Sequence, residues 1–310
     1  MKITALAGGI GASKFLAGLA RVIPPEDITI IANTGDDMEM FGLRICPDID
    51  TVIYTLAEVV NQQTGWGIEG DSFECLRSLA RLGEDVWFNL GDRDLATHIH
   101  RTSQLMRGRT LAEVTDSIRR SLGVRSRIVP MADAYTPTRV ITDEGDLHLQ
   151  EYFVRRKCEP LVKAIRYENI ERARPSEGVE QAILEADCVI LCPSNPFISI
   201  GPILAVPGVR DLLKQTKAEV AAITPIVAGR ALKGPTADML RSLGHEVSAT
   251  GVARLYSDFA KLFVLDETDI DLKESIEKLG LRVMMTNTVM TTMEDKENLA
   301  RRTLEVMSNE

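Results

Sequence analysis

A glycine-rich segment near the start of the chain has the composition of a phosphate-binding loop. It contains Gly8, Gly9 and Gly11 and ends in Lys14. Closely spaced glycines let backbone N–H groups approach an anion, and a following helix directs the positive end of its dipole to the same place. A dinucleotide fingerprint needs a third glycine where Lys14 stands, and a P-loop needs a Gly-Lys-Ser/Thr run that is missing. We expect the loop to bind a nucleotide or diphosphate other than NAD. A tight strand-to-helix turn without a ligand is the alternative.

Acidic side chains follow the next apolar run of the chain, residues 28–32. Asp36 and Asp37 come shortly after it, and Asp50 lies in a later Pro-Asp-Ile-Asp-Thr segment. Carboxylates beside a diphosphate suit Mg²⁺, which prefers oxygen ligands from protein and phosphate. We predict a Mg²⁺ site made by Asp36, Asp37 and Asp50. Other interpretations stay open. The first two aspartates could cap a polar turn, and Asp50 could cap the next helix or accept a proton from a substrate hydroxyl.

Residues 89–102 form a polar segment with two histidines, His98 and His100. On a helix these two side chains point about 200° apart, so their spacing alone does not make them ligands of one metal. Carboxylate and phosphate also suit Mg²⁺ better than imidazole does. The segment is therefore either a helix-capping ion network or a source of arginines for a phosphate.

Two further loops follow predicted strands. Ser194 and Asn195 lie in residues 193–202, where their polar groups could hold a phosphate or contact the edge of a nucleobase. Residues 228–235 offer two cations, Arg230 and Lys233. Ligands of open α/β sheets bind along the carboxyl edge, so several such loops together favour a nucleotide site there.

Short apolar runs alternate with amphipathic helical stretches along most of the chain. This pattern predicts an α/β fold with a Rossmann-like, doubly wound, mostly parallel sheet in a single domain over residues 1–310. A hairpin over residues 138–150 breaks the alternation, and we place it with several helices in an inserted subdomain over residues 41–170. We predict strands at residues 2–6, 28–32, 86–88, 127–129, 188–192, 219–223, 246–248 and 262–265, and helices at 15–22, 51–61, 72–82, 111–122, 178–185, 235–243 and 294–307.

Composition narrows the class of protein. The 310 residues carry a formal net charge of -9, which argues against general binding to nucleic acid or to an anionic membrane. The five cysteines are scattered and include no C-x-x-C pair, so neither a disulfide framework nor a zinc ribbon is indicated. No apolar run approaches the roughly 20 residues that span a bilayer. We expect a soluble, cytoplasmic protein that acts on small molecules.

Five segments together resemble the CofD family, the 2-phospho-L-lactate transferases of coenzyme F-420 biosynthesis. They are residues 8–14, 33–37, 47–51, 90–94 and 193–196, and the resemblance extends in family order over nearly the whole chain. It implies a Mg²⁺-dependent transferase that moves a 2-phospho-L-lactyl group from lactyl-2-diphospho-5'-guanosine to the ribityl hydroxyl of 7,8-didemethyl-8-hydroxy-5-deazariboflavin (Fo). GMP is the product released. A homodimer is also implied.

The same resemblance implies roles for individual residues. Asp50 contacts the deazaflavin and is the first candidate to orient or deprotonate the attacking hydroxyl. Asn89 holds the position of a second deazaflavin contact, where a basic residue is expected in many relatives. We expect seven residues to bind the donor substrate. Its diphosphate is assigned to Gly8, Gly9, Gly11 and Lys14, and its guanosine to Ser194, Asn195 and Gly201.

Two questions stay open at this point. Lactyl and enolpyruvyl donors differ by only two hydrogens, so the sequence does not choose between them. A non-catalytic regulatory protein of the same fold, binding a nucleotide or nucleotide-sugar, is the alternative to the transferase.

Overall fold

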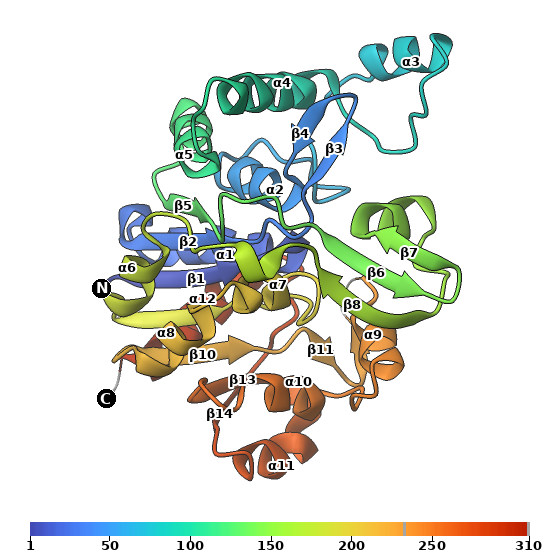
Figure 1. The fold of residues 1–310 in the computed structure, drawn as a ribbon. Coiled ribbons are helices and arrows are strands. Elements are labelled where there is room, and N and C mark those ends of the chain that lie inside the picture. Colours follow the sequence, from blue (N-terminus) through green and yellow to red (C-terminus); the bar gives the residue numbers. More distant parts are fainter. Residues whose placement is uncertain (232–233, 309–310) are drawn as a thin grey trace.

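The computed structural model describes residues 1–231 and 234–308, and its centre is a seven-stranded parallel sheet (Figure 1). The strand order is β14-β13-β10-β9-β1-β2-β5. This confirms the predicted Rossmann-like α/β class. The strands are β1 (Ile3–Ala7), β2 (Ile28–Ala32), β5 (Arg127–Pro130), β9 (Cys188–Leu191), β10 (Glu219–Ile223), β13 (Leu262–Asp266) and β14 (Arg282–Thr286).

The order of the strands reverses between β1 and β9. One half of the sheet extends from β1 to β2 and β5, and the other extends from β9 to β10 and onward. In open α/β sheets, ligands bind at such a switch point, beyond the carboxyl ends of the strands. The glycine-rich loop follows β1 and the Ser194 loop follows β9, so both leave the sheet at this point.

Helices cover both faces of the sheet, so most of its strands are buried and apolar on both sides. Phe15 and Leu19 of α1 belong to one hydrophobic core, and Ile203 and Leu213 belong to the core on the other face. The helices are α1 (Gly9–Val22), α2 (Pro47–Leu56), α3 (Glu74–Arg81), α4 (Asp92–Met106), α5 (Leu111–Ser121), α6 (Val179–Leu184), α7 (Ile200–Ala205), α8 (Val209–Gln215), α9 (Thr236–Ser242), α10 (Ala249–Tyr256), α11 (Lys273–Glu277) and α12 (Met293–Met307).

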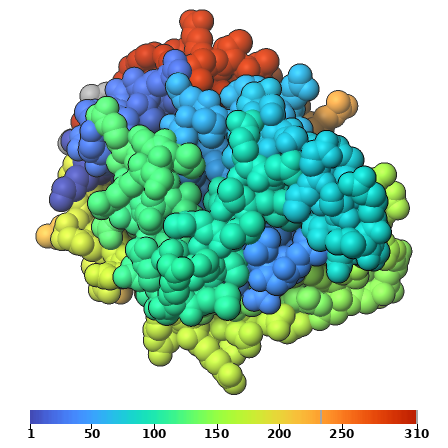
Figure 2. Space-filling view, turned by 90° about the horizontal axis from the view of Figure 1, so that it is seen from above, coloured from blue at the N-terminus to red at the C-terminus, as the bar shows by residue number. Residues whose placement is uncertain are grey.

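Residues 41–170, expected to be one inserted subdomain, are divided by the main sheet, because β5 lies within this range and pairs with β2. The first excursion holds a hairpin, β3 (Met38–Met40) and β4 (Leu43–Ile45), and helices α2 to α5. Seen from above, its blue, cyan and teal atoms cover much of the surface (Figure 2).

The second excursion contains the predicted hairpin, confirmed as β6 (Thr138–Thr142) and β7 (Gly145–His148). A third strand that was not predicted, β8 (Val162–Tyr167), pairs with β6. Between β7 and β8 the chain forms a short π-helix, Glu151–Arg155.

Two predicted strands are wrong. Residues 86–88 form no strand. The apolar side chains of Trp87 and Phe88 pack instead against the β3–β4 hairpin. Residues 246–248 lead into α10, where the Ser248 hydroxyl accepts a hydrogen bond from the Gly251 N–H as an N-cap. Besides β3, β4 and β8, the prediction missed edge strand β14 and the small hairpin β11 (Ile226–Val227) and β12 (Arg230–Ala231). No helix in the described parts of the chain is long and apolar enough to cross a bilayer.

Candidate active site

A cavity of about 390 Å³ opens at the carboxyl edge of the sheet, beside the switch point. Both excursions contribute to its wall, with α2 and α4 from the first and the π-helix from the second. The residues that line it include Gly8, Gly9, Gly11, Asp36, Asp48, Asp50, Trp66, Phe88, Asn89, Asp94, His98, Gln150, Phe153, Ser194 and Asn195.

The glycine-rich loop lies on the cavity wall. Gly9 has a φ of +71°, a backbone conformation that residues with a side chain rarely adopt. Gly11 packs so closely on the Pro193 carbonyl that a Cβ would overlap it. The Ser194 hydroxyl donates to the Gly8 carbonyl at 2.6 Å. These contacts join the loops after β1 and β9 into one surface.

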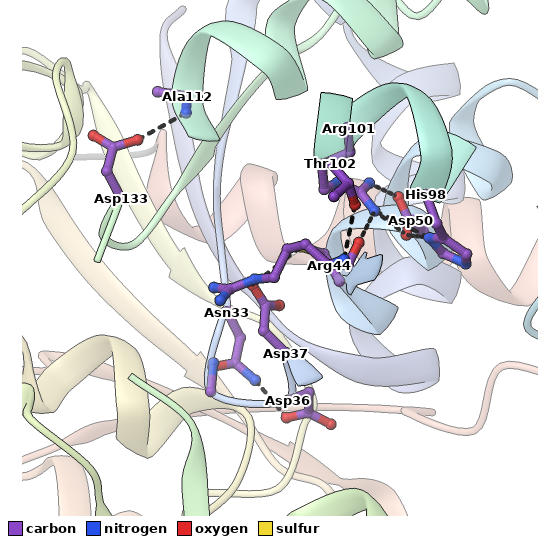
Figure 3. A network of polar contacts seen from close by, with 12 residues as sticks. Asn33, Asp36, Asp37, Arg44, Asp50, His98, Arg101, Thr102, Ala112 and Asp133 are labelled. Carbon is purple, nitrogen blue, oxygen red and sulfur yellow. Dashed lines mark hydrogen bonds and ion pairs between the residues drawn. The ribbon is translucent and has the colours of Figure 1, made fainter. Parts of the chain in front are cut away.

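Asp36, which is partly buried, and Asp48, which is buried, form a carboxylate pair beside this surface. One amide serves both, because Asn33 Nδ2 donates to Asp36 Oδ1 at 2.7 Å and to Asp48 Oδ2 at 2.8 Å. Figure 3 shows the Asn33–Asp36 contact. Burial raises the pKa of Asp36 well above its usual range, and the charge of Asp48 raises it further. Burial also raises the pKa of Asp48 to about 6, against the opposing effect of the Asn33 amide. Two neighbouring carboxylates with raised pKa values are suited to share a cation.

Asp50 lies inside the first turn of α2, which begins at Pro47, so the N-cap interpretation is wrong. Arg101 of α4 reaches across to it, as Figure 3 shows. Arg101 Nη1 donates to Asp50 Oδ2 at 3.0 Å, and Nη2 donates to Asp50 Oδ1. The Arg101 side chain is fully buried, and Asp50 lines the cavity.

His98 lies between two carboxylates. Its Nδ1 is 3.6 Å from Asp50 Oδ2, and its Nε2 is 3.4 Å from Asp94 Oδ1. The Tyr54 hydroxyl donates to the same Asp94 oxygen at 2.7 Å. Burial alone would raise the pKa of Asp94, but the contacts with His98 and Tyr54 outweigh it and lower the pKa. The ligand atoms of Asp50, Asp94 and His98 lie within 4.8 Å of one another, so this group is a second place that could hold a metal.

Comparison with known proteins decides the family. The family model described as 2-phospho-L-lactate transferase CofD matches residues 3–310. The chain belongs to the CofD family. The family match confirms the predicted enzyme class, a transferase.

Named relatives of this CofD chain cover nearly its whole length. A 2-phospho-L-lactate transferase from Methanothermobacter thermautotrophicus is 43% identical over 299 residues, which are 96% of each chain. A phosphoenolpyruvate transferase from Streptomyces griseus is 39% identical over 312 residues, 99% of this chain and 98% of the relative. A crystal structure of an upf0052 family protein from Bacillus halodurans has the same fold, with a TM-score of 0.64, 15% identity and 98% of each chain covered.

Three predicted CofD site residues are not among the described residues that line the cavity. Asp37 turns away, and its Oδ2 accepts from Arg44 Nε at 3.2 Å and Nη2 at 2.9 Å. Lys14, one turn into α1, donates from Nζ to the Met290 carbonyl at 3.2 Å. Gly201, in α7, packs against Tyr167 instead.

The remaining predicted polar and basic residues differ in whether they lie on the cavity wall. Ser194 and Asn195 line the cavity, as does Asn89. His100 is exposed while His98 is buried, which agrees with their opposite directions on a helix. Arg230 lies in β12 outside the described cavity wall, and Lys233 is outside the described residues.

The sequence interpretation missed several residues of this CofD site. Asp48 sits two positions before Asp50, on the same turn of helix, and that spacing was the available signal. Arg101 and Asp94 lie in the polar segment 89–102, which was interpreted as a capping ion network or a phosphate contact, and their contacts with Asp50 and His98 were not foreseen. No local signal pointed to Gln150, because its place on the cavity wall depends on the packing of distant segments.

Proposed function

We propose that this CofD family member transfers a 2-phospholactyl group from a guanosine diphospho-lactate to the ribityl hydroxyl of Fo, with Mg²⁺ and with release of GMP. The observation that supports this most is the convergence of the glycine loop, four cavity carboxylates and an aromatic wall on one cavity at the switch point. Phosphoryl transfer needs mainly positioning and neutralisation of charged oxygens, which such a wall can supply.

The carboxylate set fits a divalent cation. Asp48 is buried and Asp36 is partly buried. They share one amide and have raised pKa values, so a cation beside them would offset an electrostatic cost. We propose that Asp36 and Asp48 hold the ion, in place of the expected set with Asp37. Asp50 instead belongs to the group with Asp94 and His98. Bound by Asp36 and Asp48, Mg²⁺ would neutralise charge on the diphosphate oxygens.

The acceptor would occupy the aromatic part of the cavity. Trp66, Phe88 and Phe153 come from three separate segments and all line it. Flat aromatic side chains suit a tricyclic ring, and Asn89 on the same wall offers it a hydrogen-bonding amide. The remaining wall, with Gly8, Gly9, Gly11, Ser194 and Asn195, would take the guanosine diphosphate part.

In the proposed reaction the ribityl oxygen attacks the phosphorus next to the lactate. A new P–O bond forms there, the bond to the bridging oxygen breaks, and GMP leaves with that electron pair. The hydroxyl proton passes to a base or to solvent. Asp50 is our candidate to orient this hydroxyl, since its carboxylate is fixed at the cavity wall by Arg101.

Two finer points are part of the proposal. Relatives with either name, lactate or phosphoenolpyruvate transferase, have similar identity to this chain, so we propose lactyl as the first donor to test and enolpyruvyl as the second. We also propose a homodimer, on the family resemblance, which light scattering would detect as twice the chain mass of 34.2 kDa.

The test is Fo-dependent release of GMP from each donor, run with Mg²⁺ and with EDTA. The proposal expects release only when Fo, donor and Mg²⁺ are all present. Fo fluorescence gives a second readout, because a non-catalytic nucleotide-binding protein needs no pocket for a tricyclic ring. Failure to bind Fo, with nucleotide binding retained, would favour that alternative.

A further inference from the structure

Arg101 is the largest fully buried side chain in the described part of the molecule, and the proposed reaction does not use it directly. It lies on α4, and its only carboxylate partner among the described residues is Asp50. A buried guanidinium is costly unless it is paired, so Asp50 and Arg101 must be treated as one unit. Asp50 lines the cavity, and Arg101 is not among the described lining residues.

The contact leaves Asp50 with free acceptor capacity. The two ends of the guanidinium fork bind the two carboxylate oxygens, one each. A carboxylate has about four lone-pair positions, and the fork occupies two of them. One position on each oxygen therefore stays available for a substrate hydroxyl or a cation, while the plane of the carboxylate is fixed.

His98 adds a directed support to this pair. Its Nδ1 lies 3.2 Å from Arg101 Nη1. A guanidinium only donates hydrogen bonds, so Nδ1 accepts, and in the neutral ring the proton is on Nε2, facing Asp94. The Tyr54 hydroxyl donates to Asp94 from the other side. His98 Nε2 itself lies 3.4 Å from Asp94 Oδ1 and makes no hydrogen bond within the described residues, so the directed contact of this ring is the one with Arg101.

We propose that Arg101 is a positioning residue for the transfer reaction, with His98 as its support. It fixes the Asp50 carboxylate in the orientation that the attacking hydroxyl requires. The inference rests on the proposed function. The inference goes beyond that function because it assigns a role in turnover to Arg101, a side chain outside the described cavity wall.

The chain offers a matched control. Arg44 is also a buried arginine held by an aspartate, Asp37, with Nε and Nη2 both on one carboxylate oxygen. Neither Arg44 nor Asp37 is among the described residues of the cavity wall. Arg101 Nη1 donates to the Arg44 main-chain carbonyl at 3.5 Å, a contact that a side-chain substitution keeps. Arg44→Lys therefore disturbs a comparable buried pair in the same excursion without changing a side chain of the cavity wall.

The experiment compares Arg101→Lys with Arg44→Lys and the native protein, measuring kcat, KM for Fo and Fo binding. Lysine keeps the charge but cannot span both oxygens. Loss of orientation at a reacting group costs about 100-fold in rate, so we expect kcat of Arg101→Lys to fall by about that factor. Fo binding and KM should stay within about threefold, as should all parameters of Arg44→Lys.

A folded Arg101→Lys protein with kcat within about threefold of native would overturn the positioning role. An equal loss in Arg44→Lys would do the same, because it would show a general effect of breaking buried pairs. If Arg101→Lys does not fold, His98→Asn tests the support, and we expect a loss of kcat of about 10–100-fold with Fo binding kept. Full turnover in a folded His98→Asn protein would then overturn the proposal. Absence of GMP release by the native protein would instead remove the proposed function, and the positioning role with it.

Discussion

The substitution Asp50→Asn should cost far more stability than the loss of one exposed carboxylate. Asp50 is 4% exposed and Arg101 is 0% exposed, so solvent screens the pair little. Burial alone would lower the pKa of Arg101, but the charge of Asp50 outweighs this effect and raises it. Asparagine removes the charge and leaves the guanidinium buried without its counter-ion. Breaking one side of a buried pair typically costs about 3–5 kcal/mol, and we expect a loss of unfolding free energy in that range.

Urea unfolding followed by circular dichroism measures this loss at pH 7. Removing both charges should be much less costly than the two single losses together, because neither partner is then left alone. We expect the double variant Asp50→Asn/Arg101→Gln to show a coupling free energy of about 2–3 kcal/mol. Turnover should not return with stability, since the oriented carboxylate is still missing.

Two results would refute this reasoning. One is a folded Asp50→Asn protein that loses less than about 1 kcal/mol, which would mean that the pair is hydrated. The other is simple additivity of the two single losses, which would mean that the residues are not coupled. Full turnover by Asp50→Asn with an unchanged pH profile would remove Asp50 from the proposed role at the hydroxyl.

Three further outcomes follow from the site. Burial raises the pKa of Asp48 from 3.8 to about 6, so the folded state holds its proton more tightly, and this group's contribution to stability is lost as the pH rises from about 4 to 6. In urea titrations the unfolding free energy of the native protein should fall by on the order of 2 kcal/mol over this pH range because of Asp48, and Asp48→Asn should lack this fall. The same pH dependence in both proteins would contradict the prediction. Gly11→Ala should cost about 1–3 kcal/mol in thermal or urea unfolding, because its Cβ overlaps the Pro193 carbonyl; a native-like value would show that the loop relaxes. Trp66 is 39% exposed on the cavity wall, and Trp66→Ala should weaken Fo binding by about 10-fold in a fluorescence titration, whereas an unchanged Kd would place the ring elsewhere.

Local patterns predicted the sheet where strands are buried on both faces. The runs at β1, β2 and β9 are continuously apolar and bounded by turns, so their type was readable. Edge strand β14 is partly exposed and begins with an arginine, which hides the pattern. Residues 86–88 misled the prediction because burial against a hairpin produces the same composition as burial in a sheet.

Site residues were also predictable only where the signal lies within one short segment. The glycine loop and Asp50 were recognisable because each lies in one short segment. The partner of Asp50 was not, since Arg101 follows 51 positions later and meets it only when α4 packs over α2. Asp37 was assigned with its neighbour Asp36, but adjacent side chains in a turn diverge, and Arg44 holds this one away from the cavity.

The most direct test of the central proposal is the identity of the product made from Fo. The purified protein is incubated with Fo, Mg²⁺ and lactyl-2-diphospho-5'-guanosine, and the deazaflavin fraction is analysed by mass spectrometry as GMP is quantified. The proposed function predicts Fo carrying one added phospholactyl group, in amounts equal to the GMP released. Unmodified Fo, or GMP release that does not depend on Fo, would contradict it.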